Sequence, residues 1–183
     1  MKKLTIYSMA TCAIMAALMC VLGPLSIPIG PIPISLLTLA IYLAAFVLGP
    51  KECTISVLIY ILLGAAGLPV FSGAAGGLAK LAGPTGGYIV GYLFLAFICS
   101  TFVKKSNANI ILSVVGMIVA TAVLYAFGTA WFMIEMKTDL VSSLTMCVFP
   151  FIPGDFAKIV AATLIGKALR VALTKANLLP ENK

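Results

Sequence analysis

The chain has 183 residues, of which 62% are hydrophobic and 9% are charged, and its formal net charge is +7. This composition excludes an ordinary soluble domain, in which about a quarter of the residues are charged, and predicts a single integral membrane domain over residues 1–183. In a soluble protein this positive charge would suggest a nucleic-acid partner. In so apolar a chain we expect it to set the orientation in the lipid bilayer, with no nucleic-acid partner.

Metal and cofactor chemistry is not indicated by the residue types present. The chain contains no His, which removes the commonest metal ligand and the usual general base. The Cys residues lie singly in apolar runs, without the spacing of a metal site, and we interpret them as small buried hydrophobes. They are Cys12, Cys20, Cys53, Cys99 and Cys147. We therefore expect no metal and no cofactor.

Six apolar segments follow one another along the chain. They cover residues 4–22, 34–48, 53–68, 83–103, 110–134 and 154–173. Because a spanning helix needs about 20 apolar residues, we predict an all-α membrane protein with six transmembrane helices in one compact bundle. The segments at 34–48 and 53–68 are short for this task, which indicates either a boundary error or a region that does not face lipid.

Basic residues are distributed unevenly between the two sides that six spans would create. Lys80 and Lys137 are the basic residues of one side. The other side carries nine, which are Lys2, Lys3, Lys51, Lys104, Lys105, Lys167, Arg170, Lys175 and Lys183. Since cytoplasmic loops carry the excess of Lys and Arg, we predict a multi-pass protein of the cell membrane with both termini in the cytoplasm.

Two loops on the predicted outer side have an unusual composition. Residues 23–33 hold four prolines and no charge, and residues 69–83 are rich in Gly and Ala with one Lys. Irregular apolar backbone at membrane depth survives where it packs on protein or lines a cavity. We therefore expect both loops to fold inward and cover a ligand pocket.

Asp155 and Lys158 are ionisable residues at the start of the last apolar segment, just after Pro150 and Pro153. Residues at positions i and i+3 share one face of a helix, and ionisable groups at membrane depth usually face a cavity. Asp155 alone could serve as a first-turn carboxylate, with Lys158 as its intrahelical partner or a snorkelling side chain. The second, compatible interpretation is that both face a pocket, where Asp accepts ligand N–H groups and Lys donates to a carbonyl or carboxylate.

The glycine-rich stretch 76–88 is the second candidate for a binding region. Glycines let the backbone approach a ligand closely, while Thr85 adds a hydroxyl and Tyr88 an aromatic wall. Tight helix packing at small residues is the structural alternative for this stretch. Lys80 is its one charge, and it either faces solvent or reaches an anionic ligand.

Small residues also form a stripe on the first apolar segment, where Ala13 and Ala17 stand four residues apart. Such stripes let helices approach closely in lipid. Packing within the bundle is one explanation, and a partner subunit is the other. Trp131, at the outer end of the fifth segment, is interpreted as an anchor at the membrane interface.

Three motifs in this order resemble the BioY family, which comprises the biotin-specific substrate-binding subunits (S components) of energy-coupling factor (ECF) transporters. They are residues 67–73 (GLPVFSG), 83–88 (GPTGGY) and 150–158 (PFIPGDFAK). The resemblance covers nearly the whole chain. It implies a six-helix bundle that binds biotin near the outer face and works with a transmembrane coupling subunit and two cytoplasmic ATPases.

The resemblance also implies roles for individual residues. Asp155 and Lys158 match the family's Pro-Gly-Asp-x-x-Lys motif and would hold biotin, while Ala13 and Ala17 would dock against the coupling subunit. Further candidates for biotin contact are Ser72, Thr85 and Tyr88, with Lys80 and the backbone of Gly86 and Gly87 for the tail carboxylate. Relatives often have Gln where this chain has Leu37, which places a polar contact there in doubt.

Two other functions are compatible with the sequence. The chain has no Gly-x-x-x-x-Gly-Lys-Ser/Thr motif, so we expect any ATP to be hydrolysed by partner subunits and expect this chain not to be an enzyme. A small intramembrane enzyme that uses Asp155 as its acid or base is one alternative. A stand-alone, ion-driven vitamin transporter is another.

Overall fold

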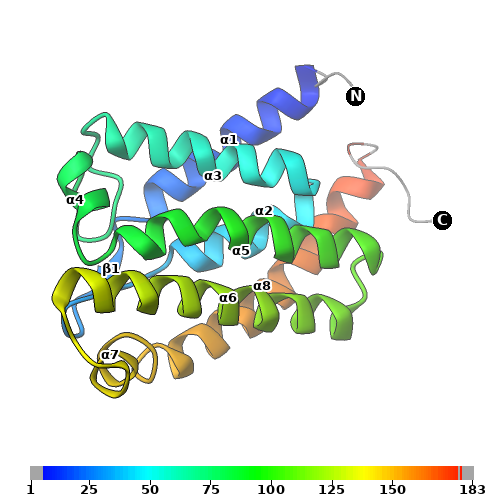
Figure 1. Ribbon diagram of the computed structural model, residues 1–183. Helices are drawn as coiled ribbons and strands as arrows, with labels where there is room; N and C mark the ends of the chain where they lie inside the picture. The colour runs from blue at the N-terminus through cyan, green and yellow to red at the C-terminus, as the bar shows by residue number, and fades with distance from the viewer. Residues whose placement is uncertain (1–5, 177, 179–183) are drawn as a thin grey trace.

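The computed structural model describes residues 6–176 and 178, which form eight helices and one two-stranded hairpin (Figure 1). The elements are α1 (Ile6–Leu22), β1 (Ser26–Ile27), β2 (Ile34–Ser35), α2 (Leu37–Val47), α3 (Pro50–Ala65), α4 (Leu78–Ala82), α5 (Gly86–Lys105), α6 (Ile110–Met136), α7 (Leu140–Cys147) and α8 (Ile152–Lys175). The first two residues of the predicted 4–22 segment, together with Lys2, Lys3 and Lys183, lie outside the described residues.

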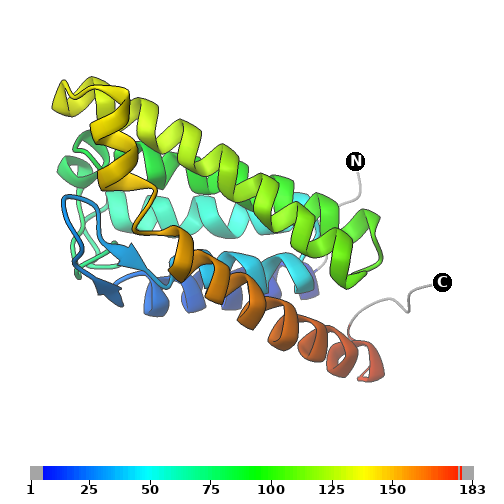
Figure 2. The same ribbon diagram turned by 90° about the horizontal axis from the view of Figure 1, so that it is seen from below.

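The long helices form a bundle with two distinct ends (Figure 1). The β1–β2 hairpin, α4 and α7 lie at one end, which we call the loop end. The start of α1, the α2–α3 turn, the end of α5 and the end of α8 lie at the other, which we call the terminus end. Within the bundle α5 packs along α6 and α3, and α2 packs on α5 and α8. Figure 2 shows α8 diverging from α6 toward the terminus end.

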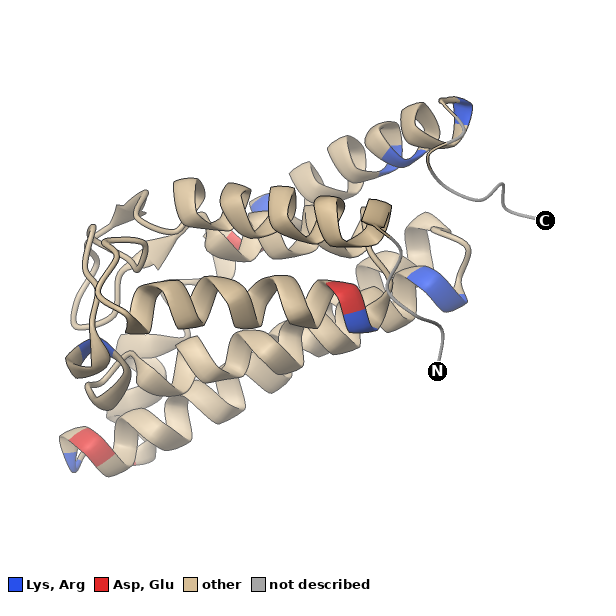
Figure 3. Cartoon of the chain, turned by 90° about the horizontal axis from the view of Figure 1, so that it is seen from above, with Lys and Arg blue, Asp and Glu red and all other residues tan. Residues whose placement is uncertain are grey.

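The helices differ in length and hydropathy. Among the described residues, α5 and α6 are each long and apolar enough to cross a membrane, and α7 with α8 forms a third such stretch, bent by 46° at the break. The helices α1 and α2 are apolar but shorter. The all-α prediction is therefore confirmed, apart from one short hairpin, while the count of six spans stays a prediction. Figure 3 shows most of the charged residues toward the two ends of the bundle.

Element boundaries differ from the predicted segments where prolines and the hairpin intervene. Ile34 and Ser35 do not begin a helix, because they pair with Ile27 and Ser26 in the antiparallel hairpin. The helix α3 starts at Pro50, and Pro153 lies in the first turn of α8. Proline is tolerated at these positions because a main-chain N–H in the first turn would have no intrahelical acceptor. The short helices α4 and α7 were not predicted.

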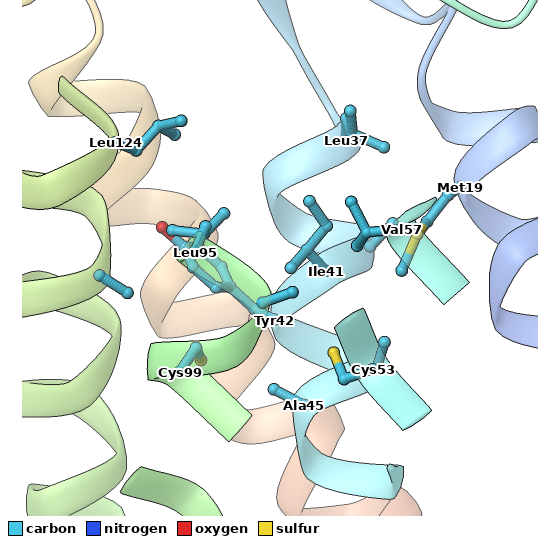
Figure 4. Close-up of a cluster of buried hydrophobic side chains, with 14 of the residues drawn as sticks. Met19, Leu37, Ile41, Tyr42, Ala45, Cys53, Val57, Leu95, Cys99 and Leu124 are labelled. Carbon is cyan, nitrogen blue, oxygen red and sulfur yellow. The ribbon is translucent and has the colours of Figure 1, made fainter. Parts of the chain in front are cut away.

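The core is centred on α2, which explains why this segment is short. Nine of its residues are buried, and a helix that is apolar and buried on all sides faces protein instead of lipid. In Figure 4, Ile41 and Tyr42 of α2 lie between Val57 of α3 and Leu95 of α5. The hydroxyls of Tyr42 and of Thr121 in α6 also form a hydrogen bond, with 2.5 Å between their oxygens. Of the two explanations for the short segment, the structure supports the one without lipid contact.

The cysteines follow the prediction made for them. All five are free thiols, and four of them are buried. Cys20 is only partly buried. Cys53 and Cys99 belong to the apolar cluster around α2 (Figure 4), where they act as small hydrophobic side chains.

Candidate functional site

Two small cavities lie next to each other at the loop end, with volumes of about 20 and 30 Å³. The first, here called the aromatic cavity, is lined among others by Leu37, Tyr60, Phe71 and Ile89. The second, here called the charged cavity, is lined among others by Thr38, Leu124, Tyr125, Phe151, Asp155 and Lys158. Both share Ile32, Pro33, Ser35, Tyr88 and Tyr92, so the second half of the hairpin and one face of α5 separate them.

Asp155 and Lys158 form a buried ion pair in the wall of the charged cavity. The two residues are only 6% and 8% exposed, respectively. Lys158 Nζ lies 2.9 Å from Asp155 Oδ1. The main-chain N–H of Asp155 donates to Phe151 in the first turn of α8. The two residues therefore form an intrahelical pair at a helix start and also line a cavity, while their contact with a ligand stays a prediction. Lys158 does not snorkel to the surface.

Three other elements complete the hydrogen bonds of the pair. Tyr125 of α6 donates to Asp155 Oδ2 at 2.5 Å, and Thr38 of α2 donates to Oδ1 at 3.4 Å. Lys158 donates at 2.6 Å to the main-chain oxygen of Ser35 in β2. A buried ion pair repays its desolvation only when such additional bonds are present. The Asp155 carboxylate thus connects α8 to α2 and α6 through hydrogen bonds, and the Lys158 ammonium connects α8 to the hairpin.

The aromatic groups around this pair give the site its apolar character. The ring of Phe151 contacts those of Tyr88 and Tyr125 at centroid distances of 6.2 and 6.4 Å. The ring of Tyr60 meets Phe71 edge-on at 5.7 Å. An apolar aromatic enclosure with a few convergent polar groups is the usual form of a small-molecule site. This one suits a ligand that presents both N–H donors and an oxygen acceptor.

Three of the predicted contact residues line the aromatic cavity, namely Ser72, Thr85 and Tyr88. The hydroxyls of the last two are used within the protein. Thr85 donates to the main-chain oxygen of Lys80 at 3.2 Å, and Tyr88 donates to that of Cys147 at 2.9 Å. Tyr88 therefore contributes its ring as a wall, as predicted, and its hydroxyl ties α5 to α7.

Gly86, Gly87 and Lys80 line neither cavity. A Cβ at Gly86 would lie 3.2 Å from Nε1 of Trp131 and would collide with the backbone of Leu81, and one at Gly87 would collide with Trp131. Gly86 thus allows α4 to approach the start of α5, and Gly87 allows α6 to pack closely on it. Tight packing at small residues was the structural alternative for this stretch. Lys80 is partly exposed on α4, and its contact with a ligand stays a prediction.

Trp131 joins two segments at the loop end, and its role as an anchor at a membrane interface stays a prediction. Its Nε1 donates to the main-chain oxygen of Gly83 at 3.1 Å, which fixes the loop before α5 against the last turns of α6. Leu37 is 2% exposed and lines the aromatic cavity. This position therefore supplies an apolar wall to the cavity.

Ala13 and Ala17 lie on the exposed face of α1, whereas Cys12 and Ala16 face the bundle. Cys12 and Ser56 join α1 to α3, because Ser56 donates to the main-chain oxygen of Cys12 at 3.1 Å. Packing within the bundle is therefore carried by Cys12 and Ala16. The stripe at Ala13 and Ala17 remains available to a partner or to lipid.

The two loops of unusual composition only partly follow the inward course that we expected. Ile32 and Pro33 of the first loop, with Ile34 and Ser35 that follow it, and Phe71 and Ser72 of the second do line the cavities. The tip of the first loop, residues 27–31, is exposed. The hairpin explains the difference, because its turn carries the chain away from the bundle before β2 returns.

Several residues of the site were missed by sequence analysis. Tyr92 lies four residues after Tyr88, and this helical spacing could have placed both rings on one cavity wall. Tyr125 is a hydroxyl in the middle of an apolar segment, which is a weaker signal of the same kind as Asp155. No sequence signal distinguished Thr38 and Ser35 from other loop and helix hydroxyls.

Comparison with known proteins places this fold and site in a family. The sequence model of the BioY family matches residues 1–175. The chain belongs to the BioY family. It is 35% identical over 177 residues to the biotin transporter BioY2 of Lactococcus lactis subsp. cremoris, with 97% of each chain covered. It is 36% identical over 158 residues to the biotin transporter BioY of Thermotoga maritima, with 86% of this chain and 92% of the relative covered.

A solved structure supports the same relationship. The chain matches a crystal structure of the S-component for biotin from an ECF-type ABC transporter with a TM-score of 0.83 and 34% sequence identity. The match covers 89% of this chain and 90% of the other. Within the residues described, no group of three or more His, Cys, Asp and Glu side chains is placed to hold a metal ion.

Proposed function

We propose that this BioY protein is the biotin-binding membrane subunit of an ECF-type vitamin uptake transporter. It captures biotin at the outer face of the cell membrane and delivers it to the cytoplasm together with a coupling subunit and two ATPases. The observation that carries the proposal is the buried Asp155–Lys158 pair in an aromatic enclosure at the loop end. The names of the matched relatives, which are biotin transporters, support it.

The chemistry of biotin fits the two sides of this pair. Its ureido ring presents two N–H donors and one carbonyl oxygen, which suit the carboxylate of Asp155 and the ammonium of Lys158. The thioether ring and the aliphatic tail suit the rings of Tyr88, Tyr92 and Phe151. Lys80 remains our candidate for the tail carboxylate, because its main-chain oxygen accepts a hydrogen bond from Thr85 on the wall of the aromatic cavity.

Binding requires the two cavities to open. Their volumes of about 20 and 30 Å³ are enough for one or two water molecules, whereas small-molecule sites measure about 300 Å³ or more. Ile32, Pro33 and Ser35 of the hairpin line both cavities, so displacement of this strand joins them into one. The hydrogen bond from Lys158 to Ser35 holds the hairpin in place and is released when a ligand carbonyl takes the ammonium.

The orientation and the partners follow the same reasoning. We propose six spans with the loop end outside and both termini in the cytoplasm, because the predicted cytoplasmic side carries nine of the basic residues. The coupling subunit docks on the exposed stripe of Ala13 and Ala17 on α1. ATP hydrolysis belongs to the partners.

Equilibrium binding of labelled biotin to the purified protein in detergent tests the proposal. Wild-type protein should bind biotin saturably and in preference to other vitamins. Asp155→Asn and Lys158→Met should each weaken binding at least tenfold, whereas Glu135→Gln, an exposed carboxylate at the end of α6, should leave it unchanged. Absence of saturable binding by the wild type would overturn the proposal.

Two further measurements separate the alternatives. Mass spectrometry of the ligand recovered from the protein should return unaltered biotin, and a chemically changed product would favour an enzyme. Uptake of biotin should require the partner subunits. Uptake by this chain alone in a host that lacks ECF ATPases would favour a stand-alone, ion-driven transporter.

A further inference from the structure

A second polar cavity lies at the terminus end, away from the biotin site. Its volume is about 230 Å³, and it is bounded by α1, the α2–α3 turn, the end of α5 and the last turns of α8. Its apolar lining includes Val47 and Leu48, and its polar lining includes Thr11, Glu52, Lys104 and Arg170. It is larger than either cavity at the loop end, and the proposed uptake function assigns nothing to it.

Arg170 is held in this wall by the end of α2. Its Nη1 donates to the main-chain oxygen of Phe46 at 3.1 Å, in the last turn of α2, where helix carbonyls lack intrahelical partners. A guanidinium carries five N–H donors in a planar fork, so its anchoring on α2 is compatible with binding an anion. The bond fixes the position of this positive charge beside the cavity.

Lys104 and Glu52 approach each other over Gly49, on the other side of the cavity. A Cβ at Gly49 would lie 2.5 Å from Glu52 Oε2 and 3.7 Å from Lys104 Nζ. Within the described part of the chain, Glu52 and Lys104 do not form a direct ion pair, unlike Asp155 and Lys158. The hydroxyl of Thr11 is used within α1, because it donates to Tyr7. The lining of the cavity thus includes the side chains of two basic residues and one carboxylate.

This arrangement matches a ligand that carries both signs of charge. A phosphodiester would meet both Arg170 and Lys104 in the lining of this cavity, and guanidinium and ammonium groups bind phosphate oxygens strongly. An ammonium attached two carbons away fits the carboxylate of Glu52. The end of an apolar bundle with a cluster of basic residues is also where headgroups meet a membrane protein. We propose that the terminus-end cavity binds the phosphoethanolamine headgroup of a phospholipid.

Lipid retention measured by native mass spectrometry tests this site on the full chain. The protein is released from detergent after incubation with an equimolar mixture of phosphatidylethanolamine, phosphatidylglycerol and phosphatidylcholine that have the same acyl chains. The wild type should retain phosphatidylethanolamine at least threefold over the other two. The double variant Lys104→Gln/Arg170→Gln should lose at least tenfold of this retention, and Glu52→Gln should shift it toward phosphatidylglycerol.

A matched control separates the cavity from the general surface charge. Lys51→Gln/Lys105→Gln removes the same charge at the same end from exposed residues that do not line the cavity, and it should retain phosphatidylethanolamine like the wild type. Elution as a single species in size-exclusion chromatography checks the fold of each variant. If variants that carry Arg170→Gln do not fold, Lys104→Gln alone replaces the double variant, because Lys104 is exposed and its substitution should not disturb the fold.

Four outcomes decide the proposal. Equal loss in both double variants, or equal retention of the three lipids by the wild type, overturns it. Selective loss in the cavity variant supports it. Thermal stabilisation by free phosphoethanolamine, absent with inorganic phosphate, supports the same headgroup chemistry and shows that the acyl chains are not needed for recognition.

Discussion

The two ends of the bundle place charged residues in opposite environments. Asp155 and Glu52 are both first-turn carboxylates, of α8 and α3 respectively. Asp155 is buried and accepts hydrogen bonds from Lys158, Tyr125 and Thr38, whereas Glu52 is half-buried beside an open cavity. A carboxylate in the first turn of a helix therefore does not have one fixed role. When it is buried, as Asp155 is, it needs hydrogen-bond partners within the protein, and when it is partly exposed, as Glu52 is, it does not.

The largest expected effect comes from removing the carboxylate of Asp155, with removal of Glu52 as the comparison. Asp155→Ala should destabilise the protein by about 3–5 kcal/mol, because it leaves Lys158 as an uncompensated buried charge. Glu52→Ala should cost about 0.3–1 kcal/mol, the value of a first-turn carboxylate near the surface. Thermal unfolding in detergent measures both, and similar losses would remove the distinction between the two ends.

A double substitution separates stability from binding at the loop end. Replacing both buried partners by apolar residues of similar size is often neutral or stabilising, so Asp155→Leu/Lys158→Met should recover most of the stability lost in Asp155→Ala. It should not recover biotin binding, because neither polar group remains. Recovery of binding together with stability would show that the pair serves only the fold.

The next largest effect concerns the hydroxyls that face the charged cavity. Tyr125→Phe should destabilise the protein by about 1.5–3 kcal/mol, because the hydrogen bond to the Asp155 carboxylate is lost. Tyr92→Phe is the matched variant, since Tyr92 lines the same cavity and its hydroxyl donates no hydrogen bond within the described residues. It should leave stability within about 0.5 kcal/mol of the wild type. Equal losses in the two variants would contradict this account.

A smaller effect is expected where α5 and α6 approach each other at the loop end. A Cβ at Gly128 would lie 2.5 Å from the ring of Tyr88. Gly128→Ala should therefore cost about 1–3 kcal/mol through overpacking, partly offset by about 1 kcal/mol of helix propensity. Biotin affinity should fall as well, because the displaced ring lines both cavities. Unfolding and binding measured on the same preparation test the two effects together.

The sequence predicted the charged centre of the site because charge is rare in this chain. Asp155 and Lys158 stand out in an apolar segment, and their spacing of three residues is enough to put them on one face of a helix. Their partners Thr38 and Tyr125 did not stand out, because hydroxyls are common in apolar helices and their direction depends on how α2 and α6 pack on α8. The local pattern of residues does not determine how distant helices pair.

The fold was predicted to a similar depth. Hydropathy predicted the helical segments, but not that α2 lies inside the bundle, because an apolar helix reads the same against lipid and against protein. Prolines marked residues 23–33 as irregular, but not the pairing of Ile27 with Ile34 in a hairpin. The glycines at 86 and 87 signalled close approach, and only the position of Trp131 shows that the approaching group is a helix.

The smallest expected effect uses a glycine as a matched control for Gly128. A Cβ at Gly154 would meet only Ile34, at 3.8 Å, which is an ordinary contact. Gly154→Ala should therefore stabilise the protein by about 0.4–1 kcal/mol, because the unfolded chain loses conformational freedom and the first turn of α8 gains a better helix former. A loss of stability in thermal unfolding would mean that the hairpin presses on α8 more closely than its contacts indicate. The two alanine substitutions would then both destabilise the protein, which would contradict the proposal that the hairpin is the segment displaced when biotin binds.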